Sequence, residues 1–212
     1  MTETDLPDRG WRGSPDVWLD AAYEALVSGG VDAVKIMPLA QALRLSRTSF
    51  YWFFKDRKAL LSGLLDRWEA STTRPLVAAT RDYAATETEA MLNVISVFLS
   101  DRLFDTGLEL AVRAWAQQDD AVLARLQQAD AERLDALRML LASWGHTAED
   151  ADVRARTIYL VQVGYISMRV TESLDERFER FPKYVEIYTG LRPPEHEMER
   201  FRARIGLPVP RP

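Results

Sequence analysis

Hydrophobic and polar positions along this chain recur with helical spacing, and proline and glycine interrupt the pattern rarely after the first third. No proline lies between Pro75 and Pro182, and the glycines in that interval are Gly107, Gly145 and Gly164. This spacing favours long helices, and we find neither a β-hairpin signal nor an internal repeat. We therefore expect an all-α fold, with helices over residues 15–29, 36–43, 47–53, 57–72, 87–100, 107–117, 120–143, 148–173, 177–189 and 194–204.

Several of these helices begin after residues that can cap a free backbone N–H. Ser46 precedes one helix and Asp56 precedes the next, and each side-chain oxygen can accept from the following turn. The same signature is found at Ser14–Pro15, at Thr86 with Glu89 and at Thr147 with Asp150. These residues support the helix starts given above.

Residues 39–61 place a short apolar helix, a tight turn and a second short helix in helix-turn-helix order. At 3.6 residues per turn, Phe50 and Phe54 fall on one stripe of the second helix. The opposite stripe carries Arg47, Thr48, Tyr51, Trp52 and Lys55. The aromatic run 50–54 could be only core, but five consecutive positions cover every direction around a helix, so some rings must face outward. Cationic and hydroxyl groups on the outer stripe are suited to binding a polyanion that also presents hydrogen-bonding groups along its edges.

Basic residues are concentrated in the same part of the chain. Residues 33–58 contain six Lys or Arg and only Asp56 as an acid, which gives this segment a net charge of +5. The whole chain carries −5. We therefore expect attraction to phosphates to come from this segment rather than from the rest of the molecule.

With these residues, the sequence resembles the tetracycline-repressor-like (TetR/AcrR) transcription regulators, and the resemblance extends upstream through residues 17–43. The matching elements are Ala22, Gly30, Leu39–Ala40, Ser46, Phe50–Tyr51, Phe54 and Leu60. In that family a three-helix head places its third helix in the major groove of DNA, and a fourth helix leads to a larger ligand-sensing body. The resemblance implies a helix-turn-helix DNA-binding domain at 14–56 and a helical ligand-binding and dimerisation domain at 57–205. The residues at the two ends predict a disordered arm at 1–13 and a proline-rich tail at 206–212.

The resemblance also assigns DNA contacts by position. The base-reading positions are Arg47, Thr48 and Ser49, and the phosphate-binding positions are Lys35, Tyr51, Trp52, Lys55 and Arg57. Arg47 is the strongest candidate for sequence choice because arginine can donate two parallel hydrogen bonds to guanine. The chain departs from the family pattern at Arg44, where a glycine is usual in the turn, and at Phe53, where a histidine is usual. Arg44 must therefore adopt a turn conformation that glycine adopts at lower cost, and Phe53 is interpreted as a packing residue.

Residues 157–170 are apolar nearly all the way around their helix, so we expect this helix to be covered. In the family that the sequence resembles, the corresponding helix and the next one form a four-helix dimer interface with the same two helices of a second copy. Gly164 would then allow close helix approach, although an ordinary packing glycine is an equal alternative. A two-fold homodimer predicts an inverted-repeat operator in double-stranded DNA.

A ligand-sensing body needs a mostly apolar cavity with a few polar groups. The candidates are Arg113 with Trp115, followed by Tyr159 and Gln162. The alternative for Arg113 is a salt bridge to Glu109, four residues earlier. For the aromatic residues the alternative is ordinary core.

Catalysis and cofactors receive little support from the sequence. Cysteine is absent, and His146 and His196 lie fifty residues apart in solvent-friendly surroundings. The acidic residues 149, 150 and 152 are interpreted as stabilising a helix start rather than binding a metal. We therefore expect no enzyme activity, no cofactor and no metal. The absence of a membrane span, of a signal peptide and of cysteine fits a cytoplasmic protein.

These features together predict a ligand-responsive transcriptional regulator, a repressor that binds its operator as a dimer and is released by an unknown small-molecule effector. The alternative is an all-helical small-molecule-binding protein or enzyme without DNA binding, whose aromatic and basic stretch is incidental.

Overall fold

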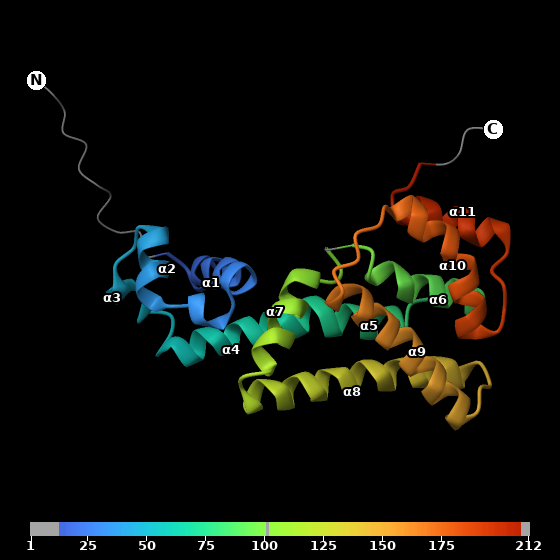
Figure 1. Cartoon of the computed structure of the whole chain (residues 1–212), viewed down its shortest axis with the longest axis horizontal. Coiled ribbons are helices and arrows are strands. Elements are labelled where there is room, and N and C mark those ends of the chain that lie inside the picture. The colour runs from blue at the N-terminus through green and yellow to red at the C-terminus, as the bar shows by residue number, and fades with distance from the viewer. Residues whose placement is uncertain (1–12, 101, 209–212) are drawn as a thin grey trace, which may run out of the picture. The chain divides into compact units, whose positions relative to one another are not determined.

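The computed structural model describes residues 13–100 and 102–208, and within that part every regular element is helical (Figure 1). The chain forms two compact units, one ending at Arg67 and the other beginning at Trp68. The predicted all-α fold is confirmed. Of the expected terminal segments, residues 1–12 of the arm and 209–212 of the tail lie outside the described residues.

The first unit is built from α1 (Pro15–Gly29), a 3-10 turn (Val31–Ala33), α2 (Ile36–Leu43), α3 (Arg47–Phe50) and most of α4 (Arg57–Trp68). Its core contains the fully buried side chains of Trp18, Ala22, Phe50 and Leu60. The Trp18 and Phe50 rings meet edge to face, with centroids 5.3 Å apart, and this contact packs α1 against α3.

Most of α4 belongs to the first unit, so the boundary between the units falls inside this helix, whereas the sequence analysis had placed one between Asp56 and Arg57. Gly63 allows a close approach to α1, because a Cβ at this position would lie 2.9 Å from Leu19 Cδ2. Arg67 at the end of the unit pairs with Asp20 of α1 at 2.5 Å. These contacts pack α4 against α1 beyond the predicted limit of the head.

The second unit starts at the end of α4 and continues through a π-helical segment (Glu69–Thr73). Its helices are α5 (Arg74–Ala79), α6 (Glu87–Val97), α7 (Thr106–Ala116), α8 (Asp120–Ser143), α9 (Ala148–Ser167), α10 (Leu174–Thr189) and α11 (Glu195–Arg204). The long helices α8 and α9 pack side by side, and α10 and α11 pack against α6 (Figure 1). Fully buried apolar residues from most of these helices form one core, which includes Leu76, Met91, Leu137, Ile158 and Val185.

The predicted helix starts agree with the observed caps. Ser46 Oγ accepts from the Ser49 N–H at 3.1 Å, and Asp56 Oδ1 accepts from the Ala59 N–H at 2.8 Å. The hydroxyl of Thr147 likewise accepts from Asp150 N at 3.2 Å. The cap signals in the sequence therefore located these ends correctly.

Five helices differ in extent from the prediction by three or more residues. Two of them are α6, which ends at Val97 rather than at 100, and α10, which begins at Leu174 rather than at 177. The helix expected at 47–53 ends at Phe50, and the next residues form a turn. The helix expected at 148–173 ends at Ser167, because Arg169 adopts a left-handed conformation with φ of 50° and Ser173 begins α10 with a capping box. The helix expected at 57–72 continues into the π-helical segment and through Pro75, which is tolerated because it lies in the first turn of α5.

Candidate nucleic-acid interface and ligand cavity

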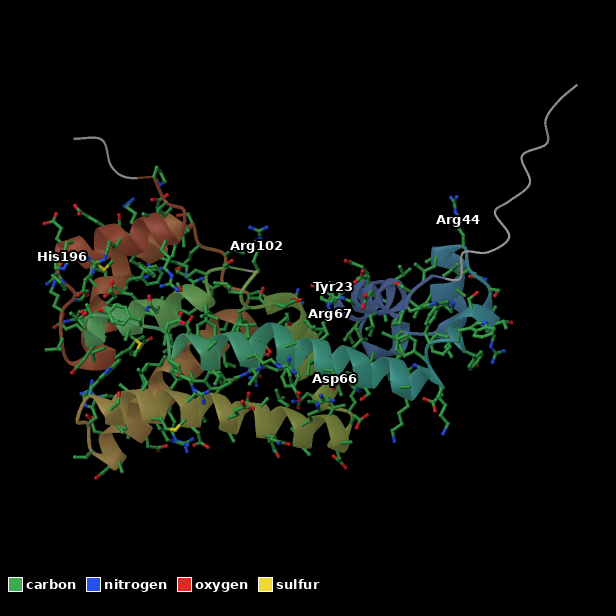
Figure 2. All side chains as sticks on the ribbon, turned by 180° about the vertical axis from the view of Figure 1, so that it is seen from behind. Tyr23, Arg44, Asp66, Arg67, Arg102 and His196 are labelled. Carbon is green, nitrogen blue, oxygen red and sulfur yellow. The ribbon has the colours of Figure 1, made fainter. Side chains whose placement is uncertain are left out.

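The turn between α2 and α3 has the geometry that the sequence required. Arg44 is left-handed, with φ of 55° and ψ of 35°, and its N–H donates to the carbonyls that end α2. In Figure 2 its side chain projects away from α2. A residue other than glycine therefore makes the turn, at some conformational cost, and places a cation beside α3.

The short helix α3 is fixed from its inner side. Phe50 is fully buried, and its ring stacks with Phe54 at a centroid distance of 5.5 Å. Ser46 caps the helix at its start. Because the inner face is anchored in this way, the outer face has a defined orientation.

The outer face of α3 and the turn after it present cationic and aromatic groups to solvent. Arg47 and Thr48 are exposed, and the exposed fractions of Tyr51 and Trp52 are 46% and 63%. Arg47 Nη2 donates to the Tyr51 hydroxyl at 3.1 Å, and its guanidinium lies 5.7 Å from the centre of that ring. Tyr51 therefore positions the arginine that was predicted to read bases.

The two lysines predicted to bind phosphate, Lys35 and Lys55, are also exposed. Lys35 lies directly before α2, at its N-cap. Both ammonium groups are thus accessible to a partner in solution.

Two predicted DNA contacts have a different environment from the one expected. Ser49 is only 8% exposed, and its hydroxyl lies 3.0 Å from Ser46 Oγ, because its position on α3 turns it toward the core. Arg57 is partly buried and donates from Nε to the Val34 carbonyl at 2.6 Å and from Nη2 to the Val31 carbonyl at 2.5 Å. Arg57 therefore holds the segment before α2 against α4, and we correct both assignments to structural roles.

The family model described as bacterial regulatory proteins, tetR family, matches residues 19–64. This match runs from α1 into α4 and includes the whole helix-turn-helix. Residues 19–64 therefore form a tetR-family domain. The predicted family is thus confirmed for this domain.

Solved structures of similar fold extend the likeness over nearly the whole length of the chain. AmtR from Mycobacterium smegmatis is 18% identical, with a TM-score of 0.61, and the match covers 97% of this chain and 100% of that one. A transcriptional regulator from Rhodococcus sp. is 14% identical, with a TM-score of 0.56, and the match covers 91% and 97% of the two chains. At these identities the likeness shows the fold alone. Comparison with curated proteins gives no match.

A buried ionic network occupies the second unit. Arg133 of α8 is fully buried, and its Nη1 donates to Glu109 at 2.9 Å and to the Tyr159 hydroxyl at 2.7 Å. Its Nε and Nη2 donate to Thr73 and Thr72 of the π-helical segment at 3.0 and 2.8 Å. The network therefore joins α7, α8, α9 and the π-helical segment through one guanidinium.

The same network includes the end of α4. Trp68 Nε1 donates to Glu109 Oε2 at 2.6 Å. Burial alone would raise the pKa of Glu109, but the charges of Arg133 and Arg113 outweigh it and hold this pKa below its ordinary value. Glu109 is thus an ionised carboxylate whose charge is compensated inside the protein.

The residues predicted to head a ligand pocket belong mainly to this network. Arg113 donates to Glu109 at 2.8 Å, to Asp130 at 2.7 Å and to the Tyr159 hydroxyl at 2.8 Å. Trp115 is buried. We correct the assignment of Arg113, because its guanidinium is paired with carboxylates, as the alternative of a salt bridge to Glu109 predicts. The cavity described next is not lined by Arg113, Trp115 or Tyr159.

A candidate ligand cavity in the second unit, called the ligand cavity below, has a volume of about 500 Å³ and opens to solvent. It is lined by the residues after α6, by α7, α9, the segment 169–172 and the start of α10. Gln162 is the predicted pocket residue that lines it. Tyr165, which the sequence offered among the aromatic candidates, also lines it, as does Arg177. Sequence reasoning missed Arg177, because its neighbours in the cavity come from other helices.

The outer side of α9 carries apolar side chains that none of the described residues covers. Leu160 is 59% exposed, and Val153 and Met168 lie on the same side of the helix and are also exposed. Gly164 lies between them, and a Cβ built there meets no atom within 4 Å. In the single chain, the helix expected to be covered on all sides is therefore covered on one side only.

The acidic residues at the start of α9 are paired with arginines. Asp150 accepts from Arg154 at 2.9 Å, and Asp152 accepts from Arg138 at 2.6 Å and from Arg156 at 2.9 Å. These hydrogen bonds lower the pKa of both carboxyl groups.

Within residues 13–100 and 102–208, no helix has the length and apolar character needed to cross a membrane.

Proposed function

We propose that this TetR-family regulator is a repressor that binds an inverted-repeat operator as a homodimer and leaves it when a small molecule occupies the second unit. Such a protein acts on the chromosome, in the cytoplasm. The observation that carries the proposal is the exposed face of α3, where Tyr51 positions the Arg47 guanidinium.

On this proposal, Arg47 and Thr48 contact base edges, and Lys35, Tyr51, Trp52 and Lys55 contact phosphates. A guanidinium can bind guanine through two parallel hydrogen bonds, whereas an ammonium binds phosphate without regard to sequence. Arg44 adds a cation beside the same helix. The basic segment 33–58 supports this assignment, because the rest of the chain is acidic.

A second copy of the chain is the partner that we propose for the outer side of α9. Exposed Val153, Leu160 and Met168 form an apolar stripe, and Gly164 leaves room for a neighbouring helix. A two-fold pair would offer two α3 helices to one DNA duplex. The variant Leu160→Glu should shift the mass measured by sedimentation toward the monomer, whereas Tyr83→Glu, at an apolar residue that is also exposed, should not.

A gel-shift titration against the DNA upstream of the gene tests the DNA-binding proposal. Arg47→Ala should relax the preference for one base pair in each half-site by about 1–3 kcal/mol. Lys55→Ala should weaken binding to all sequences alike and reduce the slope of log K against log salt by about one. Arg200→Ala is the matched control, since Arg200 lies on α11 in an exposed pair with Glu89.

An unchanged base preference in Arg47→Ala would contradict the assignment of this residue. Folded protein that retards no DNA even at low salt would favour the alternative, an all-helical small-molecule-binding protein or enzyme.

A further inference from the structure

A second, much smaller hollow of about 10 Å³ lies against the ligand cavity and is lined by Tyr184 and Tyr188 of α10. Gln162, Tyr165 and Arg177 line both the cavity and the hollow. Polar groups are therefore gathered where the two spaces meet, and a ligand that occupies the cavity would reach them with one end.

Arg177 is the cationic group at this junction. Its guanidinium carbon lies 4.5 Å from the centre of the Tyr165 ring. No carboxylate of the described residues lies within ion-pairing distance of it, and the neighbouring Glu172 is paired with Arg180. Burial lowers the pKa of Arg177 from its ordinary value. The charge of Glu172, which also lines the cavity, acts on Arg177, but Glu172 is itself paired with Arg180. A partly buried guanidinium without an ion pair of its own among the described residues would gain from an anionic ligand.

Tyr188 is an independent indication of a ligand at the same place. Its side chain is 1% exposed, and its hydroxyl has no hydrogen-bond partner within the part of the chain that the structure describes. A buried hydroxyl without a partner lowers stability, and such groups are rare in folded proteins. The Tyr165 and Tyr184 hydroxyls lie 3.3 Å apart beside it. Phenol hydroxyls can donate to an anionic oxygen.

The rest of the cavity is largely apolar. The lining residues of this kind are Phe98, Leu99, Leu110, Ile166, Val170 and Leu174. A volume of about 500 Å³ fits a small organic molecule with a hydrocarbon body. The remaining polar lining residues are Thr106, Arg169, Thr171 and Glu172, and the charge of Glu172 is paired with Arg180. The cavity therefore offers a cationic end and an apolar wall.

We propose that the cavity binds an amphiphilic monocarboxylate, with its carboxylate on Arg177 and the tyrosine hydroxyls and its hydrocarbon body along the apolar wall. The planar guanidinium fork matches a carboxylate better than it matches a hydroxyl, and it repels an ammonium. This inference rests on the proposed function, since it names the class of the effector.

Isothermal titration calorimetry of the full chain with decanoate tests the proposal in the absence of DNA, with 1-decanol and decylamine as probes of equal length. Decanoate should bind at one site per chain at least tenfold more tightly than either control. Arg177→Gln should weaken decanoate at least tenfold and remove the preference, and Arg177→Lys should give an intermediate affinity. Arg200→Gln, at an arginine outside the cavity, should bind decanoate like the wild type.

Tyr188→Phe removes only the hydroxyl without a partner. Decanoate affinity should fall several-fold, while the melting temperature of the ligand-free protein should stay the same or rise. Equal affinity for the three probes, or an Arg177→Gln variant that binds decanoate like the wild type, would overturn the proposal.

The two proposals fail in different assays. Retardation of DNA by a protein that binds no decanoate would overturn the carboxylate site and leave the DNA-binding function in place. Specific decanoate binding that depends on Arg177 but does not release DNA would support the site and contradict release by this effector.

Discussion

In the first unit Arg44 and Arg47 lie exposed around α3, whereas in the second unit Arg133 is fully buried among Glu109, Tyr159 and two threonine hydroxyls. The same side chain therefore has opposite surroundings in the two units. A buried guanidinium has every donor committed inside the chain, while an exposed one is available to a partner in solution. Burial and pairing, rather than residue type, separate structural arginines from candidate binding arginines.

The largest effect should come from Arg133, the buried member of this comparison. Arg133→Met leaves Glu109 buried without its main counter-charge, and we expect the second unit to lose about 3–5 kcal/mol of unfolding free energy. Denaturant titration at fixed protein concentration measures this loss. Arg138→Met on the same helix removes exposed pairs and should cost about 1 kcal/mol or less. A similar small loss in both variants would contradict a structural role for the buried network.

Acid should weaken the same network. Because the pKa of Glu109 is held below its ordinary value of 4.5, its contribution is present above that pH and is lost as the pH falls through the folded-state value. The difference in unfolding free energy between wild type and Glu109→Gln should therefore narrow between pH 5 and pH 3. A constant difference would mean that Glu109 does not titrate in this range.

Within the first unit, the same comparison can be made between Arg57, which donates to two backbone carbonyls, and the exposed Arg47. Arg57→Met removes charged hydrogen bonds to two backbone carbonyls and should cost about 1.5–3 kcal/mol. Arg47→Met, at an exposed position, should change the unfolding free energy little. If Arg57→Met preserved stability but reduced DNA affinity, the original phosphate-binding assignment would be restored.

Ser46→Ala removes the cap of α3. Loss of the hydrogen bond to the Ser49 N–H should cost about 0.5–2 kcal/mol, measured by thermal unfolding. DNA affinity should fall as well if α3 is the reading helix. Ser46→Asp, which retains a capping oxygen, should keep most of the stability.

Arg44→Gly should cause the smallest change in the free energy of unfolding, and this change should be an increase rather than a loss. Glycine relieves a left-handed conformation, so stability should rise by up to about 1 kcal/mol. Loss of the exposed cation should at the same time weaken retardation of DNA in a gel shift. Higher stability with unchanged DNA affinity would remove Arg44 from the interface.

Local features of this fold could be predicted from the sequence because their causes lie within a few residues. The cap at Ser46 and the left-handed turn at Arg44 are of this kind. Arg57 was misassigned because its acceptors are backbone carbonyls more than twenty residues earlier, which no residue type marks. The burial of Ser49 follows from the packing of a short helix onto a neighbouring element.

The cavity was the least predictable part of the molecule. Gln162 was identified, but Arg177 and Tyr188 have meaning only when α9 and α10 lie together. The interpretation of Arg113 depended on Asp130 and Tyr159, which belong to other helices. Chemistry that is assembled from separate helices leaves little trace in the spacing of one sequence.

Gly164 has a practical consequence for measuring assembly. A glycine inside a helix costs about 0.5–1 kcal/mol relative to alanine, and the space beyond this one is empty within the chain. A cysteine introduced at this position could therefore carry a fluorescent dye without disturbing the fold of the single chain. Its emission would report directly on whatever surface comes to rest against α9.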